Sequence, residues 1–472
     1  MERKNLAFFE NIASERDYWK KKNRYYWADI EKLIAFLVPE HASVLEVGCG
    51  TGDLLDAIKA KKKVGVDFCR NMIDMAQKKY PDITFYVMEA ESMRFQETFD
   101  FIILSNTIGY LEDIQQVLRE LKKVCHPFTK VIVTYYNFLW QPLLNMAEAL
   151  NMRMKQPEQN WLSQADINNV LYISGFDAFK SGERMLFPVN IPFVSHIFNK
   201  YLAGLPFLRK LCITNYVISK PFSPVSSDEY TGKYSVSVIV PARNENGNIE
   251  NAVLRIPHMG SHTEIIFVEG HSTDNTWEKM QEIAEKYRST HDIRIARQDG
   301  KGKGDAVRKG FEMARGDILI ILDADLTVPP EDLPKFYDAL ASGMGEFING
   351  SRLVYNMDEK AMRFLNLLGN KFFSLMFTWL LDQRFKDTLC GTKALFRKDY
   401  EYLKNGRAFF GDFDPFGDFD LIFGASKLNL KIIEIPIRYR DRTYGTTNIS
   451  RFRHGLMLLK MCLFAAKKIK FI

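Results

Sequence analysis

The residues with the clearest capacity for chemistry are two aspartates, Asp323 and Asp325, which follow a run of branched apolar residues. This run, 319–322, is preceded by Gly316 and followed by two prolines at 329–330, a pattern typical of a buried strand that ends abruptly. Because side chains alternate along a strand, the two carboxylates are expected to point the same way at its carboxyl end. Carboxylates held so close repel each other, and Mg²⁺ or Mn²⁺ relieves that repulsion while also binding phosphate oxygens. The spacing therefore predicts a metal site for a phosphorylated substrate, and a turn with two solvated acids is the plainer alternative.

The elements that must position these aspartates form an alternation of strands and helices in the second half of the chain. Strands are predicted at 235–240, 264–269, 293–297 and 317–323, with helices at 248–256, at 277–287 and up to Arg315. Such an alternation is typical of a mostly parallel sheet. A glycine-rich basic loop, 300–304, precedes the last helix and suits phosphate, because its backbone N–H groups are exposed and its lysines add charge.

The first half of the chain carries a second pattern with chemical meaning, the alternating glycines Gly48, Gly50 and Gly52. They follow a predicted strand at 43–47 and open a helix, so the backbone can turn tightly and approach a ligand. The next strand ends on Asp67, close to the spacing at which nucleoside-binding folds place a carboxylate on ribose hydroxyls. The combination indicates a nucleoside site at the edge of a second sheet.

With these motifs, the first half resembles the class I S-adenosylmethionine-dependent methyltransferases, whose first motif is Glu-x-Gly-x-Gly-x-Gly. The acidic loop of that family matches residues 88–93, although Glu89 stands where the family usually has aspartate. The resemblance implies a cofactor site made of Glu46, Gly48, Gly50 and Gly52 along the methionine part, Asp67 at the ribose, and Ala90 and Glu91 near the adenine. It also implies strands at 99–106 and 130–136 and a helix at 111–124 between them.

The methyl acceptor is not identified by any motif. Residues 137–185 should cap the site, and they carry neither an Asn-Pro-Pro-Tyr motif nor a cysteine-based methylation motif. They also lack a basic stripe with interleaved aromatic residues, which favours a small or glycan acceptor over nucleic acid. Lys62 and His126 are available as general bases, although both are more typical of surface positions. A half that has lost its chemistry and serves as a scaffold is the alternative.

The second half resembles the family 2 glycosyltransferases of the GT-A fold, in particular the polyprenyl-phosphate sugar synthases such as dolichol-phosphate mannosyltransferase. The resemblance covers about 235–450 and includes the segments 350–352, 387–393 and 434–445. By the pattern of the family, the implied residues are Pro241, Ala242, Asn244 and Glu245 at the nucleotide, Glu269 at the base, Lys303 near the diphosphate, Asp323 and Asp325 at the metal, and Glu331 in support of the loop.

The same resemblance assigns Arg352, Arg442 and Lys393 to the acceptor phosphate, and arginine suits planar, bidentate recognition of phosphate. Two departures from the family pattern put parts of this assignment in doubt. Thr327 replaces a glutamine that is a metal ligand in some members, and Asn448 replaces a lysine after the glycine loop.

Two classes of acceptor for the glycosyl group are possible, and they differ in charge and therefore in the residues that they require. A polyprenyl phosphate is anionic at neutral pH, so it needs positive residues to position it and a metal to stabilise the leaving diphosphate, but no general base. A sugar hydroxyl of a growing polysaccharide needs a base within hydrogen-bond reach. Asp420 is the candidate base, with Asp414 and Asp418 as competitors, and helix capping is the plainer role of all three.

Two apolar segments with basic residues indicate contact with a membrane surface. The final residues, 451–472, carry lysines and arginines but no acid around a short apolar core, and 361–381 forms a second apolar helix candidate. Neither reaches about 18 uninterrupted apolar residues, so no transmembrane helix is expected. Peripheral attachment to anionic lipid is the interpretation we favour, and ordinary packing on the core is its rival.

The composition sets the remaining expectations. A chain of 472 residues should hold two or three domains, and its six cysteines are scattered without paired spacing, which favours a reducing compartment and argues against zinc. No signal peptide is apparent, so a cytoplasmic location at the membrane is expected. We predict an α/β protein with two Rossmann-like domains, a methyltransferase at 1–222 and a GT-A glycosyltransferase at 234–450, joined by a linker at 223–233 and followed by the basic tail 451–472. Residues 1–40 are either a lid over a site or a packed N-terminal helix.

Overall fold

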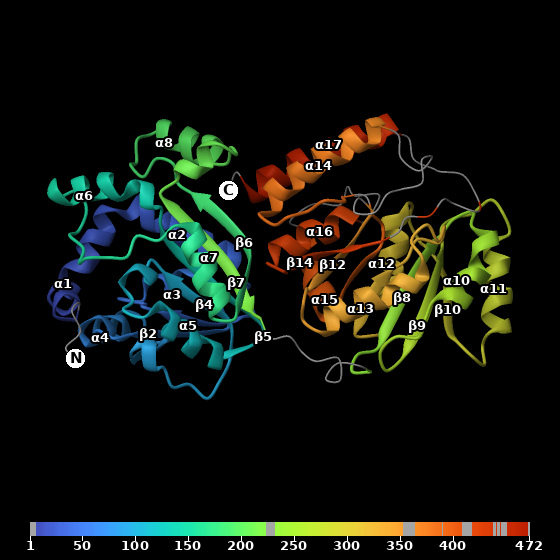
Figure 1. Cartoon of the computed structure of the whole chain (residues 1–472), viewed down its shortest axis with the longest axis horizontal. Coiled ribbons are helices and arrows are strands. Elements are labelled where there is room, and N and C mark those ends of the chain that lie inside the picture. The colour runs from blue at the N-terminus through green and yellow to red at the C-terminus, as the bar shows by residue number, and fades with distance from the viewer. Residues whose placement is uncertain are drawn as a thin grey trace. The chain divides into compact units, whose positions relative to one another are not determined.

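The computed structural model of the chain describes residues 6–222, 232–352, 364–388, 390–407, 418–437, 440, 444 and 451–470. These residues form two compact units, the first within 6–222 and the second within 232–470 (Figure 1). Each unit is built on one seven-stranded, mixed sheet flanked by helices. The predicted fold class, two Rossmann-like α/β domains, is therefore confirmed.

The sheet of the first unit has the strand order β3-β2-β1-β4-β5-β7-β6, and β7 runs antiparallel to both its neighbours. Its strands are β1 Ser43–Val47, β2 Lys62–Asp67, β3 Thr84–Val87, β4 Phe99–Ser105, β5 Cys125–Tyr136, β6 Phe176–Arg184 and β7 Thr214–Pro221. Its helices are α1 Leu6–Lys22, α2 Arg24–Leu37, α3 Asp53–Ala57, α4 Arg70–Lys79, α5 Ile114–Lys123, α6 Gln141–Ala149, α7 Gln164–Ile173 and α8 Val194–His196. The central strands are buried on both faces, as expected of parallel strands with continuous apolar runs.

Strand register and helix capping explain the local geometry of the first unit. Val47 pairs with Val66 in parallel register, so β1 and β2 end side by side and the residues that follow them come together. Helix α5 starts at Ile114, later than the predicted 111. Its start is fixed by Asp113, whose carboxylate accepts a hydrogen bond from the backbone N–H of Gln116 at 2.9 Å and so caps the first turn.

The second unit has the strand order β10-β9-β8-β11-β13-β12-β14, and β13 runs antiparallel to both its neighbours. Its strands are β8 Val236–Ala242, β9 Thr263–Glu269, β10 Asp292–Arg297, β11 Ile318–Ile321, β12 Phe347–Ser351, β13 Lys393–Phe396 and β14 Ile432–Pro436. Its helices are α10 Ile249–Arg255, α11 Thr276–Lys286, α12 Lys303–Met313, α13 Leu333–Ala341, α14 Phe364–Leu381, α15 Arg397–Gly406, α16 Asp418–Lys427 and α17 Arg451–Ile469.

Strand β11 ends at Ile321, two residues before the predicted end. The chain then forms a turn, in which the backbone N–H of Leu326 donates to the carbonyl of Asp323 at 3.1 Å and Leu326 adopts a φ of 52°. Asp323 and Asp325 therefore lie on this turn beyond the strand. Their orientation comes from the turn, and the strand alternation on which the prediction rested does not apply to them.

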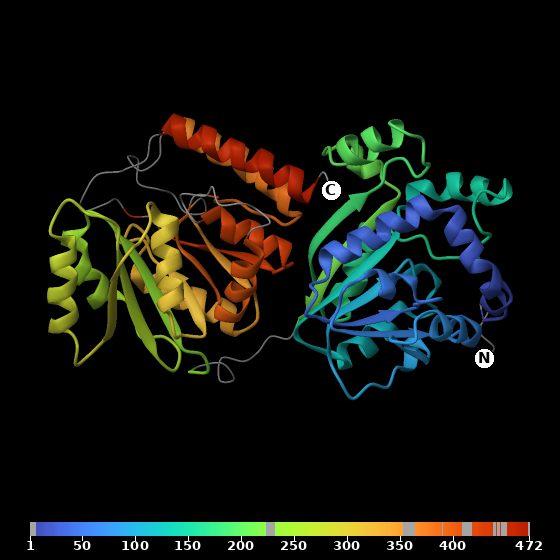
Figure 2. The same ribbon diagram turned by 180° about the vertical axis from the view of Figure 1, so that it is seen from behind.

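The two helices predicted to lie at a membrane surface pack against each other (Figure 2). Phe377 and Leu380 of α14 and Met461 of α17 are buried, whereas Leu375 is 66% exposed and Leu463 is 59% exposed. Each helix thus has one face in the core and apolar side chains in water. Within the described residues, every helix is too short or too polar to cross a bilayer.

Candidate active sites

An open pocket of about 530 Å³ lies beside the ends of β1 and β2 in the first unit. Its walls include four of the seven predicted cofactor residues: Gly48, Asp67, Ala90 and Glu91. Other residues that line the pocket were not among the predicted cofactor residues. They include Phe68, Met88, Thr107, Tyr110, Leu111 and Glu112. An acid beside apolar and aromatic walls suits a nucleoside, whose base packs on apolar surface while its hydroxyls bind carboxylate.

The glycine loop next to this pocket is held closed by Asp67. The two carboxylate oxygens accept hydrogen bonds from the backbone N–H groups of Gly50 at 2.8 Å and Cys69 at 2.9 Å. Burial raises the pKa of Asp67 above its ordinary value, and the two hydrogen bonds oppose that rise. Gly48 has a φ of +77°, and a Cβ at this position would lie 2.5 Å from the side chain of Thr107. The loop therefore requires glycine here.

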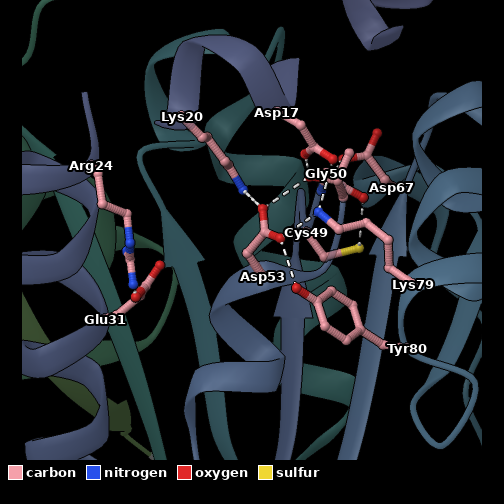
Figure 3. A network of polar contacts seen from close by, with 11 residues as sticks. Asp17, Lys20, Arg24, Glu31, Cys49, Gly50, Asp53, Asp67, Lys79 and Tyr80 are labelled. Carbon is pink, nitrogen blue, oxygen red and sulfur yellow. Dashed lines mark hydrogen bonds and ion pairs between the residues drawn. The ribbon is translucent and has the colours of Figure 1, made fainter. Parts of the chain in front are cut away.

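Helix α1 lies over the glycine loop. Figure 3 shows the amines of Lys20 and Lys79 converging on Asp53, at Nζ to carboxylate-oxygen distances of 2.5 and 2.7 Å. Arg16, one turn before Lys20, packs closely on Gly50. A Cβ atom added to Gly50 would lie 2.8 Å from the Nε atom of Arg16. Helix α1 therefore covers the glycine loop, and its residues Phe9 and Ala13 are buried.

Two side chains at this loop have buried polar atoms without a hydrogen-bond partner among the described residues, Glu46 Oε2 and Arg16 Nε. Glu46 is 3% exposed. Burial raises the pKa of Glu46 to about 8, although the charges of Lys20 and Arg16 oppose the rise. A buried acceptor and a buried donor at one loop suit a ligand that carries both an ammonium and a carboxylate.

Replacement of Glu46 by glutamine is expected to change the pH dependence of stability. The pKa of Glu46 is about 8 in the folded protein, against an ordinary value of 4.5. Between these values the folded state binds more protons than the unfolded state, so the contribution of this group to stability falls as the pH rises. Glu46→Gln should leave the melting temperature nearly unchanged at pH 5 and raise it by about 5 °C at pH 8, measured by scanning calorimetry. If the melting temperatures of the wild-type protein and the variant differ by the same amount at every pH, this account of Glu46 is wrong.

In the second unit, Asp323 forms an ion pair with Lys303, the first residue of α12, at 2.6 Å between Nζ and Oδ1. Burial alone would raise the pKa of Asp323, but the positive charges of Lys303, Lys393 and Arg352 hold it below its ordinary value. Gly391 lies directly against the pair, because a Cβ there would collide with both Asp323 Oδ2 and Lys303 Nζ. The site thus keeps an ionised carboxylate next to an ammonium.

Asp325 is oriented by Thr327. The Oδ1 atom of Asp325 accepts hydrogen bonds from the hydroxyl of Thr327 at 2.8 Å and from its backbone N–H at 3.1 Å. Within the described residues, no group of three or more His, Cys, Asp or Glu side chains could hold a metal ion. Two carboxylates on one turn nevertheless fit Mg²⁺ or Mn²⁺, which prefers oxygen ligands and takes its remaining ligands from water and substrate phosphates.

The residues predicted to border the nucleotide lie at the ends of the adjacent strands β8 and β9. They are Pro241, Ala242, Asn244, Glu245 and Glu269. Asn244 has a φ of 58°, and its Oδ1 atom accepts a hydrogen bond from the backbone N–H of Thr273 at 2.8 Å. Glu269 accepts a hydrogen bond from the backbone N–H of Ser272 at 2.5 Å. These contacts join the loops after β8 and β9 into one surface.

The predicted ligands of the acceptor phosphate have different environments. Arg352 is bound by Asp387 through two hydrogen bonds, Nε to Oδ2 and Nη2 to Oδ1, both of 2.8 Å. Asp387 is fully buried, so the guanidinium is held in one orientation. Lys393 is also fully buried and donates to the carbonyl of Cys390. Three further predicted residues lie outside the described part of the chain: Asp414, Arg442 and Asn448.

Asp420, the candidate general base, lines a different pocket. Its Oδ2 atom accepts a hydrogen bond from Arg407 Nε at 3.2 Å, and both residues belong to an apolar pocket formed by α12, α15 and α16. The described walls of this pocket include neither Asp323 nor Asp325. The competitor Asp418 is the first residue of α16, and its side chain lies outside the described part.

Sequence reasoning missed the partners of two predicted residues. The partner of Arg352 is Asp387, which the sequence analysis included only as the start of a motif. The partner of Glu331 is Arg255, which donates two hydrogen bonds to it, at 2.8 and 2.9 Å. Both partners are distant in sequence from the residues they bind, so no local sequence pattern predicts these pairs. The cations of α1 did carry a signal, because Arg16 and Lys20 are spaced one helical turn apart.

Comparison with known proteins adds two family matches. Residues 44–128 match the family described as methyltransferase domain, and residues 237–403 match the family described as glycosyl transferase family 2. All six cysteines are free thiols in the structure.

Two curated relatives and one solved structure illustrate these similarities. The chain is 41% identical to dolichol-phosphate mannosyltransferase of Pyrococcus furiosus over 122 residues, 25% of this chain and 33% of that protein. It is 39% identical to dolichol-phosphate mannosyltransferase of Saccharomyces cerevisiae over 110 residues, 22% of this chain and 40% of that protein. The chain thus spans about a third to two fifths of the length of these relatives. A methyltransferase structure from Thermotoga maritima, described as a possible histamine N-methyltransferase, covers 46% of this chain and 99% of its own at 19% identity and a TM-score of 0.36.

Proposed function

Because the chain joins a methyltransferase domain to a family 2 glycosyltransferase domain, we propose that it is a bifunctional enzyme. The second domain, 234–450, transfers a hexose from a nucleotide sugar to a polyprenyl phosphate of the dolichyl or undecaprenyl type. The first domain, 1–222, transfers a methyl group from S-adenosylmethionine to a small or glycan acceptor.

The observation that carries the glycosyltransferase proposal is the ion pair of Lys303 and Asp323 beside Asp325. A substrate diphosphate carries negative charge that increases as the sugar leaves, so it requires cations at this position. A bound Mg²⁺ or Mn²⁺, held by Asp323 and Asp325, would stabilise the charge of the leaving diphosphate. Lys303, which is paired with Asp323 here, would bind a diphosphate oxygen and add a second positive charge.

The choice of polyprenyl phosphate as the acceptor is supported by the names of the two relatives, which act on dolichol phosphate. Such an acceptor is already ionised and needs no general base. Arg352, oriented by Asp387, is the cation we assign to it. Asp420, the candidate base for a sugar-hydroxyl acceptor, is bound by Arg407 in another pocket, which is a further reason to prefer the phosphate acceptor.

The test of this proposal is a transfer assay. The protein is incubated with Mn²⁺ or Mg²⁺, polyprenyl phosphate and nucleotide sugars labelled in the sugar, and label is counted in the organic phase. Metal-dependent appearance of label there is the expected result. Release of nucleotide diphosphate with all label remaining in water would reject the lipid acceptor in favour of a hydroxyl acceptor.

For the methyltransferase domain, the support comes from the unpartnered atoms of Glu46 and Arg16 beside the glycine loop. In S-adenosylmethionine, the ammonium of the methionine part would bind Glu46 and the carboxylate of the methionine part would bind Arg16. The ribose hydroxyls would bind Asp67. The bound cofactor would supply a methyl group on a sulfonium. The residues of the chain orient it and exclude water through the α1 lid.

Arg16→Ala is expected to weaken binding of S-adenosylhomocysteine by about 10- to 100-fold, because a hydrogen bond to a charged group contributes about 1.5–3 kcal/mol. Isothermal titration calorimetry measures the affinity. The matched control is Arg24→Ala, since Arg24 pairs with Glu31 at 2.7 Å on α2 and points away from the glycine loop (Figure 3). Equal affinities for both variants would remove Arg16 from the cofactor site.

The proposal includes peripheral attachment at the cytoplasmic face of a membrane, where polyprenyl phosphate resides. The exposed apolar side chains of α14 and α17, such as Leu375 and Leu463, support it.

A further inference from the structure

The connection between β6 and β7, residues 185–213, exposes large apolar side chains on the first unit. Phe193 is 85% exposed and Phe207 is 90% exposed, while Ile197, Tyr201 and Leu211 are each 50% exposed. The connection forms the short helical segments around α8 in Figure 1. Exposed apolar side chains gathered on one segment mark a contact surface, because a monomer in water rarely leaves them together without a use.

Two polar side chains of this connection, Ser195 and Asn199, bind its own backbone. Ser195 is 2% exposed, and its hydroxyl accepts a hydrogen bond from the backbone N–H of Ile191 and donates one to the carbonyl of Val189, both at 2.6 Å. The side chain of Asn199 binds both the backbone N–H and the carbonyl of Phe187 at 2.7 Å. Backbone groups of Phe187, Val189 and Ile191 are thus satisfied within the connection itself, which favours an outer face that can leave water.

The charge of the segment has one sign. Residues 184–222 contain no aspartate or glutamate, and Lys210 is exposed and Lys200 partly exposed. The surface extends to α6 through Trp140, whose indole N–H donates to the carbonyl of Leu211 at 2.8 Å. Helix α6 adds the exposed side chains Leu143 and Met146, and Leu150 directly after the helix is also exposed. Lysines beside aromatic and aliphatic side chains complement the phosphates and acyl chains of anionic lipid.

We infer that the β6–β7 connection, together with α6, docks the methyltransferase unit onto a bilayer containing anionic lipids by inserting Phe193 and Phe207 into the headgroup–acyl boundary. The connection presents separate apolar tips on short segments, and the side chains of Ser195 and Asn199 are already bonded to its own backbone. This contact is independent of α14 and α17, which belong to the other unit. It requires neither the proposed methyl transfer nor the proposed glycosyl transfer.

The experiment is co-sedimentation of the full chain with vesicles of phosphatidylcholine, with and without phosphatidylglycerol. Because α17 can also bind vesicles, each variant is made in the wild-type chain and in a chain carrying Leu456→Ser and Leu463→Ser. The double variant Phe193→Ser, Phe207→Ser is expected to lower vesicle binding at least about tenfold, since each phenylalanine contributes about 1.5–3 kcal/mol when it leaves water. Tyr172→Ser on α7 is the matched control, because Tyr172 is 75% exposed outside the connection and its loss should change nothing.

The lysines separate anionic lipid from a merely apolar surface. Lys200→Gln with Lys210→Gln should weaken binding to the phosphatidylglycerol vesicles about tenfold and leave the weak binding to phosphatidylcholine unchanged. Thermal melts of all variants establish that they fold.

Two results would overturn the inference. The first is vesicle binding by the phenylalanine double variant equal to that of its parent in both backgrounds. The second is a wild-type dimer that the same variant converts to a monomer while vesicle binding stays intact, which would assign the surface to a second copy of the chain.

Discussion

Asp323→Asn is expected to lower kcat/KM for glycosyl transfer by about 10²- to 10³-fold, the usual cost of removing one group that stabilises transition-state charge. The carboxylate of Asp323 is kept ionised by Lys303 and lies on the same turn as Asp325. An amide at this position keeps the shape but loses the charge needed to hold a divalent cation. Initial rates with a labelled nucleotide sugar over a range of Mn²⁺ concentrations measure the effect.

The matched control for this substitution is Asp332→Asn. Asp332 is also ion-paired to a lysine, Lys335, at 2.5 Å, but this pair lies at the start of α13. Its loss should leave the transfer rate within about twofold, because a surface ion pair contributes at most about 1 kcal/mol to stability and none to catalysis. If both variants transfer at the wild-type rate, the assignment of Asp323 is wrong.

The largest stability loss is expected from Asp387→Ala. Asp387 is fully buried and accepts two hydrogen bonds from the guanidinium of Arg352, whose side chain is 14% exposed, and a third from the backbone N–H of Arg352. Removal of Asp387 takes away the carboxylate that accepts both guanidinium hydrogen bonds of the largely buried Arg352, which costs about 3–5 kcal/mol. Hydrogen exchange of peptides that cover β12 and β13 measures the loss locally, so unfolding of the other unit does not obscure it.

The second unit contains its own comparison for this effect. Glu331 and Arg255 form the same two-hydrogen-bond pair, but Glu331 is 55% exposed. Glu331→Ala should therefore cost no more than about 1 kcal/mol. Comparable losses for the two variants would show that burial of Asp387 does not govern the strength of the pair.

Local signals explain which parts of the fold the sequence predicted. The glycine loop at Gly48–Gly52 and the aspartates after β11 were found because a strand, a turn and a helix succeed one another within a short segment. The insertion of β13 between β11 and β12 was not foreseen, since strand pairing is decided by the packing of distant segments. Asp387 escaped notice for the same reason.

The sequence did not predict which apolar side chains are exposed to solvent. Residues 186–222 are apolar and are broken into short pieces by prolines, and short apolar pieces are equally common in a core. The structure instead exposes Phe193 and Phe207, while α14 and α17 bury one face against each other. Apolar content alone does not distinguish these outcomes, because both a core and an interface are built from the same residues.

The buried carboxyl of Glu46 has a further consequence, for the thermodynamics of ligand uptake. With a pKa of about 8 it is largely protonated at neutral pH, and a ligand ammonium placed against it favours the ionised form. Binding of the proposed methyl donor should therefore expel a fraction of a proton into the buffer. The apparent binding enthalpy would then vary with the ionisation heat of that buffer, and occupancy of the domain would rise with the alkalinity of its surroundings.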